Sequence, residues 1–333
     1  MSKTYLTGIQ STGMPHLGNY LGAIKPAIEF SKNSDGKFFY FIADYHCLTS
    51  LRDPALISQG IYEVAATWLA LGLDTNKAIF YKQSDVPEIF ELTWILNCHI
   101  PKGDLNRAHS YKAAMAVNEK NGKKDLDHGV NAGLFSYPVL MAADILLFDT
   151  NIVPVGKDQV QHVEIARSIA QRINQQYGEL LVEPLESLSE GKYIPGLDGR
   201  KMSKSYGNSI PLFVPEKRLK KLINKITTNS TAPDEPKSTE GSLIFDLYQL
   251  FANEEQVSSF AKEFKEGISW GHAKAGLFEV INDHLTEFRQ KYNYLMENKH
   301  LIDQELETGA KKARAIAQIT ISRLRKNIMG LKT

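Results

Sequence analysis

The sequence has only two cysteines among 333 residues, Cys47 and Cys98. Two thiols cannot supply a four-cysteine zinc or iron–sulfur site. Both lie in apolar stretches, so we expect buried thiols in a reducing compartment. No apolar run reaches the length of about 18 residues that a membrane-spanning helix needs, and no signal-peptide core follows the N-terminus. These absences predict a soluble, cytoplasmic protein with no membrane partner.

Two common nucleotide-binding fingerprints are also missing. The chain contains neither a Gly-x4-Gly-Lys-Ser/Thr loop nor a Gly-x-Gly-x-x-Gly turn. We find no internal repeat and no low-complexity segment. The formal net charge is +1, which excludes neither nucleic acid nor small molecules as partners, so the distribution of charge along the chain matters more than its sum. A nucleotide site in this chain must therefore use another device.

What the chain does have is a regular alternation of short apolar segments and helical patterns in its first half. Strand character marks residues 5–9, 38–42, 78–81 and 152–155, and helical periodicity marks 19–31, 54–71, 88–98, 137–148 and 158–177, with Pro138 placed in a first helical turn. Such alternation produces right-handed crossovers and a parallel sheet covered on both faces. We predict an α/β fold with a Rossmann-like domain at 1–210 and a helical domain at 211–333.

Parallel strands place their carboxyl ends at one edge of the sheet, where ligands bind in folds of this kind. The segments that follow the four predicted strands are 10–19, 44–46, 83–85 and 156–159. We expect these four loops to share one pocket.

Two short segments, about half the chain apart, are suited to binding a nucleotide. The first is His-Leu-Gly-Asn at 16–19, a turn between strand and helix where a helix N-terminus presents N–H groups to phosphate. The second is Lys-Met-Ser-Lys-Ser at 201–205, a donor-rich loop flanked by glycines. Taken alone, the first segment is equally compatible with an ordinary strand-to-helix turn.

Together the two segments resemble the HIGH and KMSKS motifs of class I aminoacyl-tRNA synthetases. Three further segments, at 7–10, 137–146 and 153–162, are similar to the bacterial type of tryptophanyl-tRNA synthetase. The similarity covers nearly all of 3–210 and continues more loosely to the end. It implies activation of L-tryptophan with ATP and transfer of the amino acid to tRNA(Trp), with Mg²⁺ accompanying the pyrophosphate and no dedicated protein metal site.

The resemblance also assigns roles to individual residues. The catalytic group would consist of His16, Lys201, Ser203 and Lys204. The ATP-binding residues would be Gln10, Ser11, Thr12, His16, Gly18, Asn19, Gly156, Lys157, Asp158, Ile194, Lys201, Met202, Ser203, Lys204 and Ser205. Lys157 stands where the family usually has an acid, so only its backbone contact is carried over. After the second motif, residues 206–208 depart from the family's usual Asp-Pro-like pair.

Asp144 is the residue that selects the amino acid in this interpretation. A carboxylate on an otherwise apolar helix must accept hydrogen bonds if it is buried, and a capped or salt-bridged core aspartate would satisfy that requirement as well as a ligand would. An indole N–H is a donor only and would pair with it. The tryptophan site implied by the resemblance comprises Asp144, Met141, Tyr137, Gln159, Gln10, His46, Val153 and Val155.

The second half of the chain carries two basic runs, at 217–225 and 308–333. Each is either a solvated helix face or a surface for a phosphate-rich partner. The resemblance implies that 211–333 binds the tRNA anticodon, that the last helix packs back on the first domain, and that the protein is a homodimer. Three alternatives stay open: a tyrosyl-tRNA synthetase-like enzyme, a small-molecule nucleotidyltransferase, and a non-catalytic RNA-binding paralogue.

Overall fold

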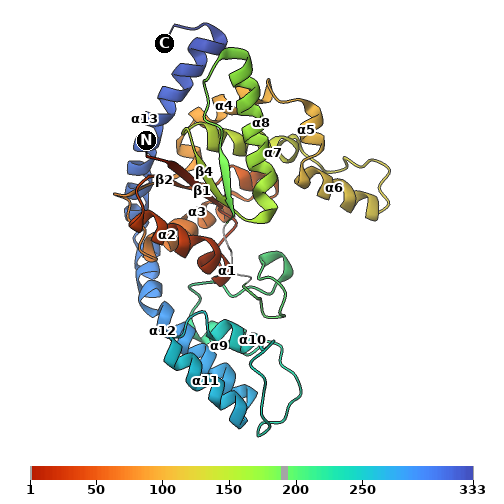
Figure 1. Cartoon of the computed structure of the whole chain (residues 1–333), viewed down its shortest axis with the longest axis vertical. Coiled ribbons are helices and arrows are strands. Elements are labelled where there is room, and N and C mark those ends of the chain that lie inside the picture. Colours follow the sequence, from red (N-terminus) through yellow and green to blue (C-terminus); the bar gives the residue numbers. More distant parts are fainter. Residues whose placement is uncertain (1, 189–193, 333) are drawn as a thin grey trace.

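The computed structural model describes residues 2–188 and 194–332 and contains one sheet of parallel strands (Figure 1). The strand order is β3-β2-β1-β4-β5. The strands are β1 (Thr4–Gln10), β2 (Lys37–Ala43), β3 (Ala78–Lys82), β4 (Ile152–Val155) and β5 (Leu185–Leu188). The predicted Rossmann-like α/β fold is confirmed. Strand β5 was not predicted, because its side chains are largely exposed and it shows no apolar pattern.

The interior strand β2 shows how the sheet is buried on both faces. Phe38, Tyr40 and Ile42 belong to one apolar cluster, which also contains Trp68. The alternate side chains, from Phe39 to Ala43, belong to the second cluster. Successive side chains of a strand point to opposite faces, so a strand covered on both sides reads as a continuous apolar run. This is why residues 38–42 could be recognised as a strand from the sequence.

The helices of the first half follow the strands in the expected alternation. They are α1 (Leu17–Asn19), a π-helical turn (Tyr20–Ile24), α2 (Lys25–Asn33), α3 (Pro54–Ala70), α4 (Glu88–Asn97), α5 (Lys102–Asn106), α6 (His109–Lys120), α7 (Ala132–Leu146) and α8 (Val160–Tyr177). The first three form one continuous helical segment. Pro26 cannot donate a helical hydrogen bond, and the π-helical turn lies directly before it.

Two local predictions were wrong. Helix α7 begins at Ala132 rather than at 137, because the Asn131 side chain caps it by accepting from the Leu134 N–H at 2.9 Å. Pro138 therefore lies inside the helix and not in its first turn. Cys98 is exposed at the end of α4, whereas Cys47 is buried as expected. In the described part of the chain, no helix is both long and apolar enough to cross a membrane.

From Glu216 onward, helices joined by loops make up the described part of the chain. These helices are α9 (Glu216–Ile223), α10 (Leu243–Tyr248), α11 (Glu254–Glu266), α12 (Trp270–Glu297) and α13 (Lys299–Met329). Helices α9 to α11 gather at the end of the molecule away from the sheet, and α13 returns along the sheet (Figure 1). One apolar cluster is continuous from β2 through Ile210 to Leu277 and Leu285 of α12. The two halves therefore share a core.

Helix α13 covers the edge strand β3. A Cβ atom built on Gly309 would lie only 1.7 Å from the carbonyl oxygen of Phe80, so helix and strand touch backbone to backbone. An uncovered edge strand would expose unpaired N–H and C=O groups, and a helix packed this closely shields them. Glycine is the residue that permits this approach.

The arginines of the basic run at 308–333 bond to acidic residues of the first half. Arg314 donates to Glu88 at 3.1 Å, and Arg325 donates to Glu91 at 2.6 Å. Arg323 donates to Asp149 at 2.6 Å. These charges are used inside the chain and are not free for a phosphate-rich partner. The run at 217–225 differs, because its basic side chains are exposed on and just after α9.

We expect Gly309→Ala to lower the free energy of unfolding by at least about 2 kcal/mol, because a new methyl group would force α13 away from β3. Gly271→Ala is the matched control, since it also adds a methyl group to a helical glycine but meets nothing closer than 4.0 Å. That change should stay within about 1 kcal/mol. Urea unfolding of both variants checks this, and equal effects would contradict the close packing.

Candidate active site

The loops after β1, β2 and β3 are bonded to one another at the carboxyl edge of the sheet. The buried Ser11 Oγ donates to Cys47 Sγ at 3.7 Å. The Tyr45 N–H donates to Gln83 Oε1 at 3.2 Å, and the Ser84 N–H donates to Asp44 Oδ1 at 3.0 Å. Three of the four loops predicted to share a pocket are thus held together. The fourth loop, at 156–159, carries Asp158, whose negative charge helps to raise the pKa of Tyr137.

The turn at 16–19 is closed by two reciprocal bonds. The His16 N–H donates to Asn19 Oδ1 at 3.0 Å, and the Asn19 N–H donates to His16 Nδ1 at 3.2 Å. This capping box fixes the start of the helix. A Cβ on Gly18 would lie 3.0 Å from the His16 ring, so glycine keeps the turn tight. The Leu17 N–H donates to the Ile210 carbonyl at 3.0 Å, which ties the turn to the segment after the second motif.

His16 is a neutral donor in this site. Burial, and then the positive charge of Lys204, lower the pKa of His16 to about 4. Its Nδ1 accepts the Asn19 N–H, so the single proton of the neutral ring lies on Nε2. The ring can therefore donate one hydrogen bond to an anion without being charged itself.

Lys204 joins the second motif to the loop after β1, just before the first motif. Its ammonium donates to the Gly13 carbonyl at 2.8 Å and to the Thr12 carbonyl at 3.1 Å. The surrounding protein lowers the pKa of Lys204 from its ordinary value because it displaces water, and the negative charge of Glu63 opposes that shift. A lysine ammonium held only by carbonyl oxygens can exchange these hydrogen bonds for bonds to an anion that binds nearby.

The loop that carries Lys204 is organised by Asn208. Its Oδ1 accepts from the Ser203 N–H at 2.8 Å, and its Nδ2 donates to Asp198 at 2.7 Å and to the Lys201 carbonyl at 3.2 Å. Sequence reasoning recorded residues 206–208 only as a departure from the family pattern and gave Asn208 no role. The sequence pattern that could have indicated this role is Gly207 followed directly by an asparagine. Gly207 has a φ of 64°, a turn conformation that favours glycine.

The other residues of this loop divide into buried and exposed positions. Ile194 and Met202 are buried, and the Met202 N–H donates to the Ile194 carbonyl at 2.9 Å. The Ser203 and Ser205 hydroxyl oxygens lie 2.8 Å apart. Lys201 and Ser205 are exposed, as are Gln10, Thr12, Gly156, Lys157 and Asp158 at the strand ends. These seven residues predicted to bind ATP are thus accessible, whereas Ser11 and His16 are buried.

Asp144 is completely buried, and its two oxygens accept hydrogen bonds from two strand-end loops. His46 Nε2 donates to Oδ2 at 2.8 Å, and Gln83 Nε2 donates to Oδ1 at 2.8 Å. Burial raises the pKa of Asp144, while the bonds from His46 and Gln83 act in the opposite direction. Gln83 was missed as a site residue, although the loop that begins with it was expected at the pocket.

Tyr137 lies beside this network. Its ring meets the His46 ring edge to face, with the centroids 5.7 Å apart, and its hydroxyl bonds to His162 Nε2. Burial, helped by the charge of Asp158, raises the pKa of Tyr137 to about 12. Val153 and Val155 are buried behind the strand ends, Met141 packs against the same apolar cluster, and Gln159 is half-buried.

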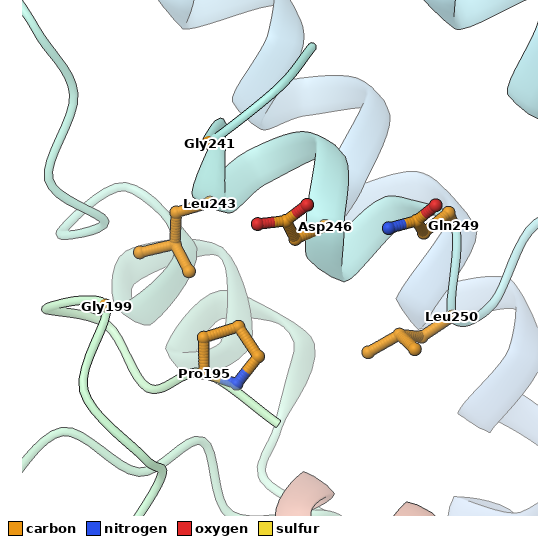
Figure 2. A pocket seen from close by; sticks show the side chains of 7 residues that line it. All are labelled: Pro195, Gly199, Gly241, Leu243, Asp246, Gln249 and Leu250. Carbon is orange, nitrogen blue, oxygen red and sulfur yellow. The ribbon is translucent and has the colours of Figure 1, made fainter. Parts of the chain in front are cut away.

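A cavity of about 560 Å³ lies between the segment that leads into the second motif and helix α10 (Figure 2). Its lining residues are Pro195, Gly199, Gly241, Leu243, Asp246, Gln249 and Leu250. Burial raises the pKa of Asp246. None of the predicted site residues lines this cavity, so it is separate from the polar groups at the strand ends.

No group of three or more His, Cys, Asp or Glu side chains is placed to hold a metal ion within residues 2–188 and 194–332. The groups gathered around the two motifs are mainly ammonium, imidazole, amide and carbonyl groups, with the carboxylates of Asp198 and Glu63 beside them. They match a phosphate-bearing substrate better than a protein-bound cation.

A comparison with protein families agrees with this geometry. Residues 2–286 match the family model described as tRNA synthetases class I (W and Y). The chain belongs to this family. This confirms the resemblance to class I aminoacyl-tRNA synthetases. The resemblance to the bacterial tryptophanyl type is confirmed by the relatives that follow.

Curated relatives and solved structures point the same way. The tryptophan--tRNA ligase of Pseudomonas aeruginosa is 53% identical over 337 residues, which cover 100% of this chain and 75% of the relative. That of Neisseria meningitidis is 48% identical, covering 97% and 96%. The structure of tryptophanyl-tRNA synthetase from Campylobacter jejuni complexed with ADP and tryptophan has a TM-score of 0.91 at 45% identity, covering 98% of this chain and 100% of that one.

The low pKa of His16 gives a pH dependence that can be measured. The unfolded chain takes up a proton on His16 near pH 6.5, whereas the folded protein does so only near pH 4. The folded state binds fewer protons between these values, so the free energy of unfolding falls as the pH is lowered from 6.5 to 4. His16→Asn keeps an acceptor in the cap but removes this titration, and should reduce the slope.

Urea unfolding at several pH values across this window tests the assignment. Part of the slope remains in the variant, because burial also lowers the pKa of His162 to about 4. His128→Asn replaces an exposed histidine and serves as the control. If His16→Asn and the control keep the slope of the unmodified protein, His16 does not titrate as described.

Proposed function

We propose that the chain activates L-tryptophan with ATP to form tryptophanyl-adenylate and transfers the amino acid to tRNA(Trp), the reaction of a tryptophan--tRNA ligase. The observation that carries this proposal is the 2.8 Å bond from the Lys204 ammonium to the Gly13 carbonyl. It holds the second motif on the loop just before the first motif, although 191 positions separate the two bonded residues. Membership in the class I family supports the same reaction.

In the first step a carboxylate oxygen of tryptophan attacks the α-phosphorus of ATP. A new oxygen–phosphorus bond forms, the bond between the α-phosphorus and the bridging oxygen breaks, and pyrophosphate leaves. The attacking carboxylate is already ionised, so no side chain has to act as a base. Catalysis then consists of positioning the reactants and stabilising charge on the phosphorus and the leaving group.

The proposed catalytic groups suit that task. Lys201 and Lys204 bring ammonium groups on a loop that already contacts the phosphate-seeking turn at Thr12 and Gly13. Ser203 supplies a hydroxyl donor. His16 supplies the Nε2–H donor of a neutral ring, since its pKa is lowered to about 4. The remaining ATP contacts are proposed at Gln10, Ser11, Gly18, Asn19, Gly156, Lys157, Asp158, Ile194, Met202 and Ser205.

We propose that Mg²⁺ enters with the ATP phosphates rather than on protein ligands. The four side chains proposed to act on the phosphates, those of His16, Lys201, Ser203 and Lys204, offer donors. A hard cation prefers oxygen ligands, of which the triphosphate offers several. When bound, the ion would neutralise charge on the departing pyrophosphate. The protein groups then need only hold the phosphates.

Tryptophan selection is proposed to centre on Asp144. A carboxylate offers about four acceptor sites, and the bonds from His46 and Gln83 leave capacity for one further donor. The indole N–H supplies a donor and no acceptor. Phenylalanine would leave that position unpaired, and a site built around such a bond rejects the analogue that lacks it by factors of about 10⁴.

The rest of the tryptophan site follows from its neighbours. Tyr137, Gln159 and Gln10 are proposed to bind the ammonium and carboxylate groups. Met141, Val153 and Val155 form an apolar wall. Asp144 has no exposed surface in this structure, so the indole must enter by moving a neighbouring side chain, and the His46 ring lies between Asp144 and Tyr137.

The proposed partners are tRNA(Trp) and a second copy of the chain, in the cytoplasm. Residues 211–333 are proposed to meet the anticodon, and the exposed basic side chains of α9 suit a phosphate backbone. On α4, Trp94 is 73% exposed and follows Phe90 by one helical turn, and Phe90 packs on the exposed Tyr45. Such an apolar face is suited to a homodimer contact.

Exchange of labelled pyrophosphate into ATP tests this function. We expect exchange that depends on tryptophan, with tyrosine and phenylalanine supporting little of it. Exchange with tyrosine instead would keep the reaction but overturn the role of Asp144. No exchange with any of the three, in folded protein with Mg²⁺ present, would favour a non-catalytic RNA-binding paralogue.

Lys204→Ala should slow adenylate formation by at least about tenfold and leave tryptophan affinity nearly unchanged, because the lost contact acts mainly on the transition state. Single-turnover adenylate formation and equilibrium tryptophan binding measure the two quantities separately. Lys265→Ala removes an exposed charge on α11 and is the control. Equal losses in rate and in tryptophan affinity would contradict the role given to Lys204.

A further inference from the structure

Glu63 is a buried acid that the proposed reaction does not use. It lies on α3 and is 9% exposed. One of its oxygens, Oε1, accepts a hydrogen bond from Gln59 Nε2 at 2.7 Å, one turn earlier on the same helix. Burying a carboxylate beside a single neutral donor is unfavourable unless a positive charge lies nearby. The environment of the second oxygen therefore matters.

That second oxygen and the Lys204 ammonium face the same point in the phosphate-seeking turn. A Cβ built on Gly13 would lie 3.6 Å from Glu63 Oε2 and 3.8 Å from Lys204 Nζ. Gly13 has no side chain to separate them, and its φ of 95° disfavours any other residue. The carboxylate and the ammonium thus border the same small space beside the turn, and the ammonium donates to the carbonyls of Thr12 and Gly13.

The position of Glu63 relative to the turn is rigid. One turn before Glu63, a Cβ on Gly60 would lie 2.1 Å from the Ser11 carbonyl oxygen and 3.1 Å from the Gly13 N–H nitrogen. Helix α3 therefore touches the backbone of the turn directly. Behind Glu63, Val64, Ala65 and Ala66 have no exposed surface, so the helix cannot shift easily. The packing of α3 therefore fixes the Glu63 carboxylate in place beside the Lys204 ammonium.

We propose that Glu63 is a positioning residue that holds Lys204 on the Thr12 and Gly13 carbonyls until ATP arrives. This inference rests on the proposed function, because it assumes that Lys204 moves from these carbonyls to the phosphates. Without ATP, the attraction of the Glu63 carboxylate favours the position in which the Lys204 ammonium donates to these two carbonyls. ATP must compete with that attraction, so Glu63 weakens ATP binding in the ground state and keeps Lys204 within reach of the reacting phosphates.

The test uses the full-length protein with Glu63→Gln, which preserves shape and the Gln59 contact while removing the charge. We expect the KM for ATP in tryptophan-dependent exchange, and the Kd for ATP without tryptophan, to fall by about threefold or more. The kcat should change less than the KM. Glu287→Gln, an equal charge change on an exposed face of α12, is the control. Glu63→Met provides a second neutral variant if the amide disturbs folding.

The decisive comparison repeats Glu63→Gln in a Lys204→Met background, where ATP binding is measured directly. If Glu63 acts through Lys204, the tightening is largely lost there. The same tightening in both backgrounds would mean simple repulsion between carboxylate and phosphates and would overturn the proposal. Unchanged or weaker ATP binding in the single variant would also overturn it. If the unmodified protein shows no exchange with tryptophan, the proposed function itself fails, which is a distinct outcome.

Discussion

The common direction of the five strands is the constraint on which the rest of the molecule depends. Because all strands are parallel, their carboxyl ends lie at one edge, and a helical crossover must join each strand to the next along the chain. The loops that carry Ser11, Asp44 and Gln83 are therefore neighbours, although they come from three separate crossovers. Their mutual hydrogen bonds turn this edge into a polar surface. The second motif then attaches to it through Lys204 and through the backbone bond between Leu17 and Ile210.

Removal of water around this edge sets the state of its ionisable groups. Burial keeps the His16 ring neutral at ordinary pH, lowers the pKa of Lys204 and raises that of Asp144. Each shift moves a group toward its uncharged form, and each group is held by a neutral partner or by an opposite charge. Charges that arrive with a substrate would then interact with fewer competing waters, which strengthens their contacts. A site of this kind suits a reaction that needs charge stabilisation and no proton transfer from a side chain.

The return of α13 onto the sheet explains why one of the two basic runs could not be interpreted from its sequence. A run with seven basic residues and no acid suggests an anionic partner, but Arg314, Arg323 and Arg325 meet acids of α4 and of the loop after α7. The run at 217–225 also has no acidic residue, and its basic side chains remain exposed. Both runs are basic along the sequence, and only the packing of the helices decides which run pairs with acidic residues of the same chain.

Apolar alternation in the sequence determined the parallel sheet, its first four strands and most of its helices, because burial on both faces leaves a pattern that local residues carry. The motifs at 16–19 and 201–205 determined the family in the same way. Only the tertiary structure decided the start of α7, the exposure of Cys98, the part played by Gln83 and Asn208, and the nearness of Glu63 to Lys204. These features depend on contacts between segments far apart in the chain, and the residues of one segment do not determine which other segment packs against it.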